Sequence, residues 1–291
     1  MRVAGSSFQD FLLCRKNLTN EVGKMADFAF AEAKGVEWGC FPAWKQWGVV
    51  HGFLCRTGGC SSLFPGGLNL SYNVGDDREK VLANRQKMAA ALDFPLERAV
   101  ACQQVHSTHV AVVTEQDAGK GTLTLADAIP ETDGMVTDCH RLPLLISYAD
   151  CVPILLADTR TGAVGAVHGG WRGSVGKIVP HALNVMKEAF GTEPGDVVAG
   201  IGPSIGPCCY EVGQEVADRA AAYPSCLTPH GPGHYMLDLW QLNTLELLEA
   251  GVPREQIYRA DCCTSCHKDR FFSYRAEKGK TGRLYAVIYR K

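Results

Sequence analysis

The sequence lacks any long apolar run and any export signal. No stretch approaches the roughly 18 consecutive apolar residues that a membrane-spanning helix requires. No basic start followed by an apolar segment opens the chain either. The first absence argues against an integral membrane protein, and the second against export. We therefore expect a cytoplasmic protein whose 13 cysteines are kept as thiols.

An excess of either charge is also missing. Lys and Arg together number 29 and Asp and Glu 31, for a formal net charge of −2. Such a chain has no basic footprint for nucleic acid or for an acidic membrane surface. Internal repeats and low-complexity tracts are absent as well. Small molecules are therefore the expected partners.

What the sequence does contain is enough apolar material for a full core, with 291 residues of which 46% are hydrophobic. Helices are predicted from the capping pair Asp76 and Asp77 to about residue 93, over 177–190 up to Gly191, and over 239–250 up to Gly251. Continuous apolar runs, typical of strands buried on both faces, occupy 110–114, 142–147, 153–158, 163–168, 197–201 and 284–290. Because strands and helices do not alternate regularly, we expect an α+β fold in which mixed β-sheets are flanked by helices in a single compact domain.

The start of the chain is patterned more weakly than the rest. Residues 1–43 mix small, charged and polar residues without a sustained period, and Met25 is an alternative start. We expect an N-terminal extension over 1–43 and the functional domain over 44–291. Deleting residues 1–24 should leave activity nearly unchanged.

Three residues, His106, Cys151 and His168, stand in turns that adjoin apolar runs. Two imidazoles and one thiolate suit Zn²⁺ or copper, and three protein ligands leave a coordination position open for water or substrate. The three lie tens of residues apart, and a lone His or Cys is usually a packed residue. The residues alone leave open whether they meet.

Two arginines in Gly-rich turns are candidate anion contacts. Arg172 lies in the segment GGWRG at 169–173, and Arg56 is followed by the glycines of segment 57–59. A guanidinium forms a planar fork that matches phosphate. A tight turn with Trp171 in the core would explain the first segment equally well.

Two motifs suggest functions that their context does not favour. GPSIG at 202–206 fits a nucleophile elbow, but Pro203 and Pro207 favour a loop over the helix that an elbow requires. CTSCH at 263–267 fits covalent haem attachment, which requires export. A structural metal on the Cys and His residues of 262–267 would want a second C-x-x-C, for which the adjacent Cys208 and Cys209 are a poor substitute. We expect these thiols to pack near the wall of the site.

From about residue 52 to 290 the chain resembles a known family. The resemblance rests on GFLCRTGG (52–59), LNL (68–70), GDD (75–77), NR (84–85), QVHS (104–107), ADCVP (149–153), AVHGGWRG (166–173), GPSIGPCCYEVG (202–213) and FFSYR (271–275). The chain is similar to the multicopper-oxidase-like laccase domain proteins, also known as the purine nucleoside phosphorylase or polyphenol oxidase family. The resemblance implies that His106, Cys151 and His168 bind a catalytic metal.

The resemblance also implies an activity: a metal-dependent purine nucleoside phosphorylase acting on adenosine, inosine and methylthioadenosine, with adenosine deaminase activity. The expected cofactor is Zn²⁺, with copper as the alternative, and the expected ligands are a purine nucleoside and phosphate. Zinc lowers the pKa of its bound water to roughly 7, which suits deamination. Cys151, His168, Arg56 and Arg172 are the expected catalytic residues, the arginines as phosphate contacts.

Several points stay open. The H-x-E…P-C-x-x-C pattern of the usual zinc deaminases is absent, so the proton-transfer residue is unassigned, with His109, Asp150 and Glu211 as candidates. Alternative functions are a copper-dependent polyphenol oxidase and a hydrolase that edits peptidoglycan precursors with Cys151 as nucleophile and His168 as base. A metal-binding protein without turnover is a third. Laccases need several coppers and many His ligands, whereas this chain has nine His in all.

Overall fold

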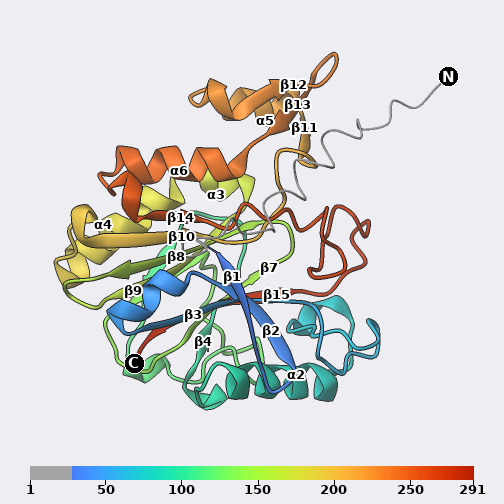
Figure 1. Cartoon of the computed structure of the whole chain (residues 1–291), viewed down its shortest axis with the longest axis vertical. Helices are drawn as coiled ribbons and strands as arrows, with labels where there is room; N and C mark the ends of the chain where they lie inside the picture. The colour runs from blue at the N-terminus through green and yellow to red at the C-terminus, as the bar shows by residue number, and fades with distance from the viewer. Residues whose placement is uncertain (1–27) are drawn as a thin grey trace, which may run out of the picture.

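The computed structural model describes residues 28–291, which form two six-stranded sheets and a small third sheet (Figure 1). The first sheet has the order β1 (Ala29–Ala33), β2 (Val36–Cys40), β3 (Val49–Leu54), β15 (Leu284–Arg290), β7 (Leu144–Tyr148) and β4 (Val100–Ala101). The second has the order β14 (Ile257–Arg259), β10 (Val197–Ile201), β8 (Val152–Asp158), β9 (Val164–Gly169), β6 (Gly134–Thr137) and β5 (Val110–Val112). The third consists of β11 (Glu211–Gly213), β13 (His234–Leu237) and β12 (Leu227–Pro229).

The two large sheets pack face to face, and helices cover their outer faces. Leu144 and Ile146 of the first sheet share one core with Leu155 and Val164 of the second. Helix α2 (Arg78–Ala91) packs on the other side of the first sheet. Helices α4 (Ile178–Phe190) and α6 (Leu239–Glu249) pack on the other side of the second. This order of layers buries β8 along its whole length, which explains why its sequence is a continuous apolar run.

The α+β fold with mixed sheets flanked by helices is therefore confirmed. The predicted helices form where their caps indicated. The Asp77 carboxylate accepts the backbone N–H groups of Glu79 and Lys80 at the start of α2. Gly191 ends α4 in the left-handed conformation with φ 67°. The segment GPSIG at 202–206 is a loop, as expected. The buried Ser204 hydroxyl accepts a hydrogen bond from Trp240 Nε1 at 2.6 Å.

Residues 29–40, which lie within the predicted extension, form the hairpin of β1 and β2. Strand β2 pairs with β3, with Trp38 opposite Leu54, so the hairpin extends the first sheet. Strand β1 is the edge strand, and its five residues are half-buried or exposed. Such a short edge strand carries little periodic signal, which is why it was not predicted. The predicted effect of deleting residues 1–24 concerns a segment outside the described residues.

Buried polar side chains tie the connections to the sheets. Arg85 is fully buried and donates to the carbonyl oxygens of Leu70, Gly121 and Thr122, each at 2.7 Å. Asn69 is also buried, and its amide oxygen accepts the backbone N–H of Arg283 at 3.0 Å. These contacts account for two of the segments that carry the resemblance, 68–70 and 84–85.

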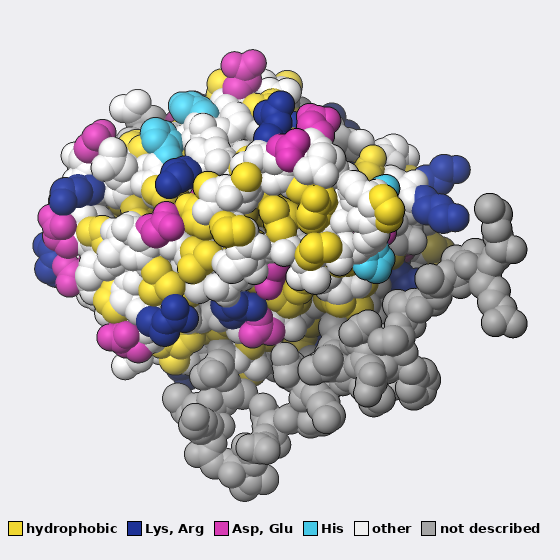
Figure 2. Space-filling model, turned by 90° about the horizontal axis from the view of Figure 1, so that it is seen from above, with side chains coloured by type: hydrophobic (Ala, Val, Ile, Leu, Met, Phe, Trp, Pro, Cys, Tyr) yellow, Lys and Arg dark blue, Asp and Glu magenta, His cyan; other side chains and the backbone are white. Residues whose placement is uncertain are grey.

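The surface is mixed in character. Viewed from above, acidic and basic side chains are interspersed with hydrophobic ones on the face that Figure 2 shows. Among residues 28–291, no helix has the length and apolar character needed to cross a membrane.

Glu246 in α6 generates a prediction about stability. Its side chain is fully buried, and neither carboxylate oxygen has a hydrogen-bond partner among the described residues. Burial raises the pKa of Glu246 to about 8. Between an unfolded pKa of about 4.3 and this value, the folded state binds more protons, so stability should fall as pH rises through this window.

We expect Glu246→Gln to remove much of that decline and to stabilise the protein at pH 9 by on the order of 1 to 3 kcal/mol. Urea unfolding at pH 5, 7 and 9 measures the effect. Glu188→Gln, at an exposed position of α4, is the control. Equal pH slopes for the wild type and Glu246→Gln would contradict the prediction.

Candidate metal centre

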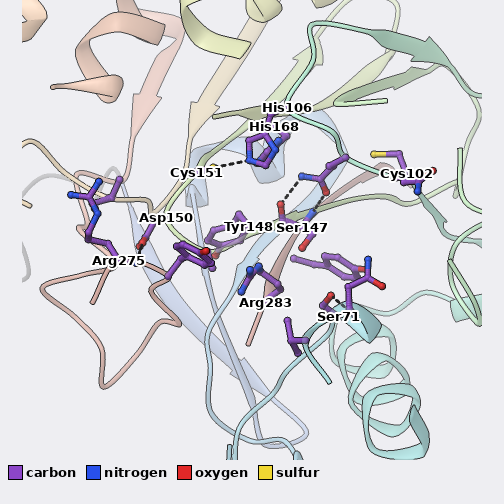
Figure 3. A pocket seen from close by; sticks show the side chains of 18 of the residues that line it. Ser71, Cys102, His106, Ser147, Tyr148, Asp150, Cys151, His168, Arg275 and Arg283 are labelled. Carbon is purple, nitrogen blue, oxygen red and sulfur yellow. Dashed lines mark hydrogen bonds between the residues drawn. The ribbon is translucent and has the colours of Figure 1, made fainter. Parts of the chain in front are cut away.

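His106, Cys151 and His168 meet at one end of the second sheet (Figure 3). Their candidate ligand atoms all lie within 4.8 Å of one another. Cys151 Sγ is 3.8 Å from His106 Nε2, and the two imidazole centroids are 4.9 Å apart. Around a tetrahedral zinc with bonds of about 2.0 to 2.3 Å, donor atoms stand roughly 3.3 to 3.8 Å apart. The three residues therefore fit one such ion.

The pairing of the strands brings these distant residues together. Strands β8 and β9 are antiparallel, with Pro153 opposite His168. Cys151 directly precedes β8 and therefore lies next to the end of β9. Strand β6 pairs with the other edge of β9, and β5 runs parallel to β6. The loop before β5, which carries His106, consequently reaches the same end of the sheet.

The buried carboxylate of Asp133, which the sequence motifs did not indicate, orients two of the three candidate ligands. Asp133 Oδ1 lies 2.9 Å from His168 Nδ1, which leaves Nε2 of that ring for a metal. The same carboxylate accepts the backbone N–H groups of Val105, His106 and Ser107. A carboxylate behind a ligating His fixes the tautomer and the ring orientation. The available signal was an acidic residue directly before a buried strand.

The backbone is strained at both loops that carry the ligands. His106 has φ 61° and Asp150 has φ 80°, values that cost energy for residues other than glycine. Hydrogen bonds to Asp133 hold the first loop. In the second, the Asp150 carboxylate accepts Thr264 Oγ1 at 2.7 Å and the backbone N–H of Arg275 at 2.6 Å. Asp150 thus positions Cys151, the next residue.

The charges of the site favour a thiolate. Burial alone would raise the pKa of Cys151, but the charge of His168 and a hydrogen bond from His106 outweigh it and lower this pKa to about 6. Burial would raise the pKa of Asp133 too, yet its hydrogen bonds from His168 and Ser107 lower it to about 2. The thiolate is the form of Cys151 that binds a metal, and an ion bound at His168 would displace the proton from Nε2 of that imidazolium.

The three candidate ligands line a cavity of about 720 Å³. This volume is in the range of small-molecule sites. Arg283 lies across the cavity from the ligands, and Arg275 lies beside Asp150 (Figure 3). Aromatic side chains, among them Trp171, Tyr210 and Tyr274, form other parts of the wall. The cavity can therefore offer a metal, cationic groups and flat apolar surfaces to one ligand.

The two arginines predicted as anion contacts do not line this cavity. Arg56 Nη1 donates to the carbonyl oxygens of Lys268 and Phe271 and pairs with Glu277 at 3.1 Å. The guanidinium of Arg172 stacks over the ring of Trp171, 4.5 Å from its centroid. Arg275 and Arg283 occupy the wall instead. Arg275 follows FFSY at 271–274, and Arg283 follows TG at 281–282, just before β15. Neither segment carries the Gly-rich pattern that singled out Arg56 and Arg172.

Of the three candidates for proton transfer, the cavity includes Asp150 alone. Its two carboxylate oxygens accept hydrogen bonds from the Thr264 hydroxyl and from the backbone N–H of Arg275, and these contacts hold the Cys151 loop. His109 Nδ1 lies near Glu131 O and Thr132 Oγ1. Glu211 pairs with His234 at 2.8 Å on the third sheet.

The sequence profile of the family described as multi-copper polyphenol oxidoreductase laccase matches residues 50–291. The chain belongs to this family. The matched range includes His106, Cys151 and His168, together with Asp133 and Arg283.

Relatives in the family carry enzyme names. The chain is 43% identical to "Purine nucleoside phosphorylase YlmD" of Geobacillus stearothermophilus over 249 residues, which cover 84% of this chain and 91% of that protein. It is 35% identical to "Adenosine deaminase RL5" of an unknown prokaryotic organism, over 77% of this chain and 87% of that protein. The crystal structure of YlmD from Geobacillus stearothermophilus superposes with a TM-score of 0.86 at 40% identity, covering 91% of this chain and 99% of that one.

The space for the candidate ligands depends on Gly170. A Cβ atom added there would lie 2.9 Å from His106 Cδ2 and 3.3 Å from Cys151 Sγ. The φ angle of Gly170 is −65°, which any residue can adopt. A side chain would therefore disturb the ligands without straining the backbone.

We expect Gly170→Ala to weaken binding of Zn²⁺ by about 10-fold or more, as for other changes that misplace metal ligands, with little loss of thermal stability. Competition with a chromophoric chelator measures the affinity. Gly195→Ala is the control, because no heavy atom lies within 4 Å of a Cβ at that position. Unchanged affinity in Gly170→Ala would show that the ion does not sit among these three side chains.

Proposed function

We propose that this protein is a metal-dependent purine nucleoside phosphorylase that acts on adenosine, inosine and methylthioadenosine. The observation that carries the proposal is the set of His106, Cys151 and His168 in the wall of a cavity that also contains Arg283. The name of the relative from Geobacillus stearothermophilus supports the same activity. We propose a purine nucleoside and phosphate as the ligands of this protein, and the cytoplasm as its location, where reducing conditions protect the Cys151 sulfur from oxidation.

His106, Cys151 and His168 are the residues that would hold the metal, with Asp133 keeping His168 in the ligating tautomer. Zn²⁺ is the proposed ion and copper the alternative, because imidazole and thiolate bind both. When bound, the ion supplies Lewis-acid chemistry with a coordination position left for substrate or water. The chain's own contribution is to fix His106 and Cys151 on strained loops and His168 on strand β9, all at one end of the second sheet.

In phosphorolysis, a phosphate oxygen forms a bond to the anomeric carbon of the ribose while the bond from that carbon to the purine nitrogen breaks. The purine takes the electron pair and a proton, and the products are ribose 1-phosphate and free base. Arg283 is suited to hold the phosphate, because its guanidinium faces the cavity opposite the ligands. The backbone N–H of Arg283 is fixed by Asn69. Tyr210 and Trp171 offer flat surfaces for the purine.

Adenosine deamination is the second proposed activity, and the relative named adenosine deaminase favours it. Deamination replaces the amino group of adenine with an oxygen from water and releases ammonia. It needs no phosphate. The same cavity would therefore support both reactions, with the anion contacts serving only phosphorolysis.

The remaining alternatives have weaker support. Within the described part of the chain, the groups that could hold a metal are these three residues and a cluster of four cysteines. That set provides few imidazoles for a centre of several coppers. A hydrolase with Cys151 as nucleophile would use His168 as base, but it gives no role to the second imidazole 3.8 Å from the sulfur. A binding protein without turnover would not need so large a cavity beside the ligands.

The proposal is tested by product analysis. Purified protein loaded with Zn²⁺ should convert inosine and phosphate to hypoxanthine and ribose 1-phosphate, both measured by chromatography. Cys151→Ala should lose one equivalent of metal and the activity together, because a ligand is removed. Cys139→Ala, which lies away from the cavity, should keep both. Activity retained in Cys151→Ala would contradict a role for the metal, and absence of both products from every substrate would overturn the proposal.

The anion contact leads to a further prediction. Arg283→Lys keeps the charge but loses the bidentate fork, so we expect the KM for phosphate to rise about 10- to 100-fold, with a smaller change for the nucleoside. Adenosine deamination by the same variant should change less. Initial rates with each substrate varied separately give the two KM values.

Three further variants make this test specific. Arg160→Lys, at the far end of β8 in an ion pair with Asp196, is the matched control. Arg56→Lys and Arg172→Lys examine the two arginines that the sequence singled out. If either raises the KM for phosphate more than Arg283→Lys does, the phosphate contact belongs to that residue.

A further inference from the structure

Four cysteines outside the proposed active site bring their sulfur atoms together. Cys208, Cys209, Cys263 and Cys266 have sulfur atoms that all lie within 4.8 Å of one another. Cys266 Sγ is 3.5 Å from both Cys208 Sγ and Cys209 Sγ. This group differs from the sequence-based candidate of 262–267, because Cys208 and Cys209 take the places of Cys262 and His267. Cys262 instead packs in the core between the two large sheets.

The fold explains how two adjacent cysteines join a C-x-x-C. The segment 204–206 pairs with 262–264, through the backbone hydrogen bonds from Ser204 to Cys262 and from Thr264 to Ser204. A turn then follows, in which the N–H groups of Cys209 and Tyr210 both donate to Gly206 O. The turn directs both Cys208 and Cys209 toward Cys266, which the extended spacing of adjacent residues would not permit.

We propose that these four cysteines form a second metal site, which binds one tetrahedral Zn²⁺ through four thiolates. This proposal goes beyond the proposed function and does not depend on it. Sulfur atoms around one zinc ion, with Zn–S bonds of about 2.3 Å, stand roughly 3.8 Å apart. The observed separations of 3.5 Å are close to that value.

Other uses of four cysteines fit the geometry less well. A disulfide requires sulfur atoms about 2.05 Å apart, and all four cysteines are outside disulfides. In a four-iron cluster each thiolate binds a different iron, so the sulfur atoms must stand farther apart than around one ion. The backbone N–H of Gly206 points to Cys263 Sγ at 3.3 Å, a contact that helps to stabilise a ligating thiolate.

The position of the site indicates a structural role. Cys208 and Cys209 lie just before β11, where the third sheet leaves the body of the protein (Figure 1). Cys263 and Cys266 follow β14 of the second sheet. An ion between them would join the small sheet to the large one. Because Thr264 donates to the Asp150 carboxylate, it would also support the loop that carries Cys151.

The test counts metal in a protein whose first site is empty. The full chain carrying His106→Ala and Cys151→Ala is prepared under anaerobic reducing conditions, loaded with Zn²⁺ and freed of loose metal on a chelating resin. Elemental analysis should find one zinc per chain. Adding Cys266→Ser or Cys208→Ser should remove that equivalent, whereas Cys139→Ser should retain it.

Two further measurements guard against a variant that simply unfolds. Circular dichroism should show the native fold for Cys208→Ser, whose side chain is exposed. Loading the protein that carries His106→Ala and Cys151→Ala with Co²⁺ should give strong thiolate-to-cobalt absorption. This absorption should weaken when Cys208→Ser is added. A zinc content unchanged by Cys208→Ser and Cys266→Ser in folded protein would overturn the proposal, as would a background protein that retains no zinc. Neither result depends on turnover, so a failure of the proposed phosphorolysis would leave this test intact.

Discussion

The buried carboxylate of Asp133 is the contact on which the proposed active site depends. It binds the ring of His168 on β9 and three backbone N–H groups of the loop that carries His106. A buried charge is stable only when it is fully hydrogen-bonded, and here the groups that satisfy it are those that must be positioned. One side chain thereby sets the ring orientation of one candidate ligand and the backbone of another.

The third candidate ligand is held by different means and links the two cysteine-containing groups. Cys151 follows Asp150, whose left-handed backbone is supported by Thr264 and by the N–H of Arg275. Thr264 lies between Cys263 and Cys266. The four-cysteine cluster, the Asp150 loop and the proposed active site are thus connected through successive hydrogen bonds, so a metal in the cluster would stiffen the loop beside the cavity.

Much of the fold could be predicted from local pattern. The runs 153–158, 197–201 and 284–290 correspond to β8, β10 and β15, because strands covered on both faces must be apolar throughout. The helix ends at Gly191 and Gly251 could be predicted because glycine favours the backbone with positive φ that follows many helices, and both glycines adopt a positive φ. The hairpin of β1 and β2 was missed, since a half-exposed edge strand has no such constraint on its composition.

The sequence by itself determined the α+β class, the family, and the soft ligand types at His106, Cys151 and His168, because these depend on residue identity and local order. Only the tertiary structure decided which side chains share a space. It placed Asp133 behind His168, brought Arg283 to the cavity wall while engaging Arg56 with Glu277, and gathered four cysteines that sequence spacing had argued against. The reason is physical: such contacts join residues far apart in the chain, and the distances between those residues depend on how the strands pair and where the turns lie.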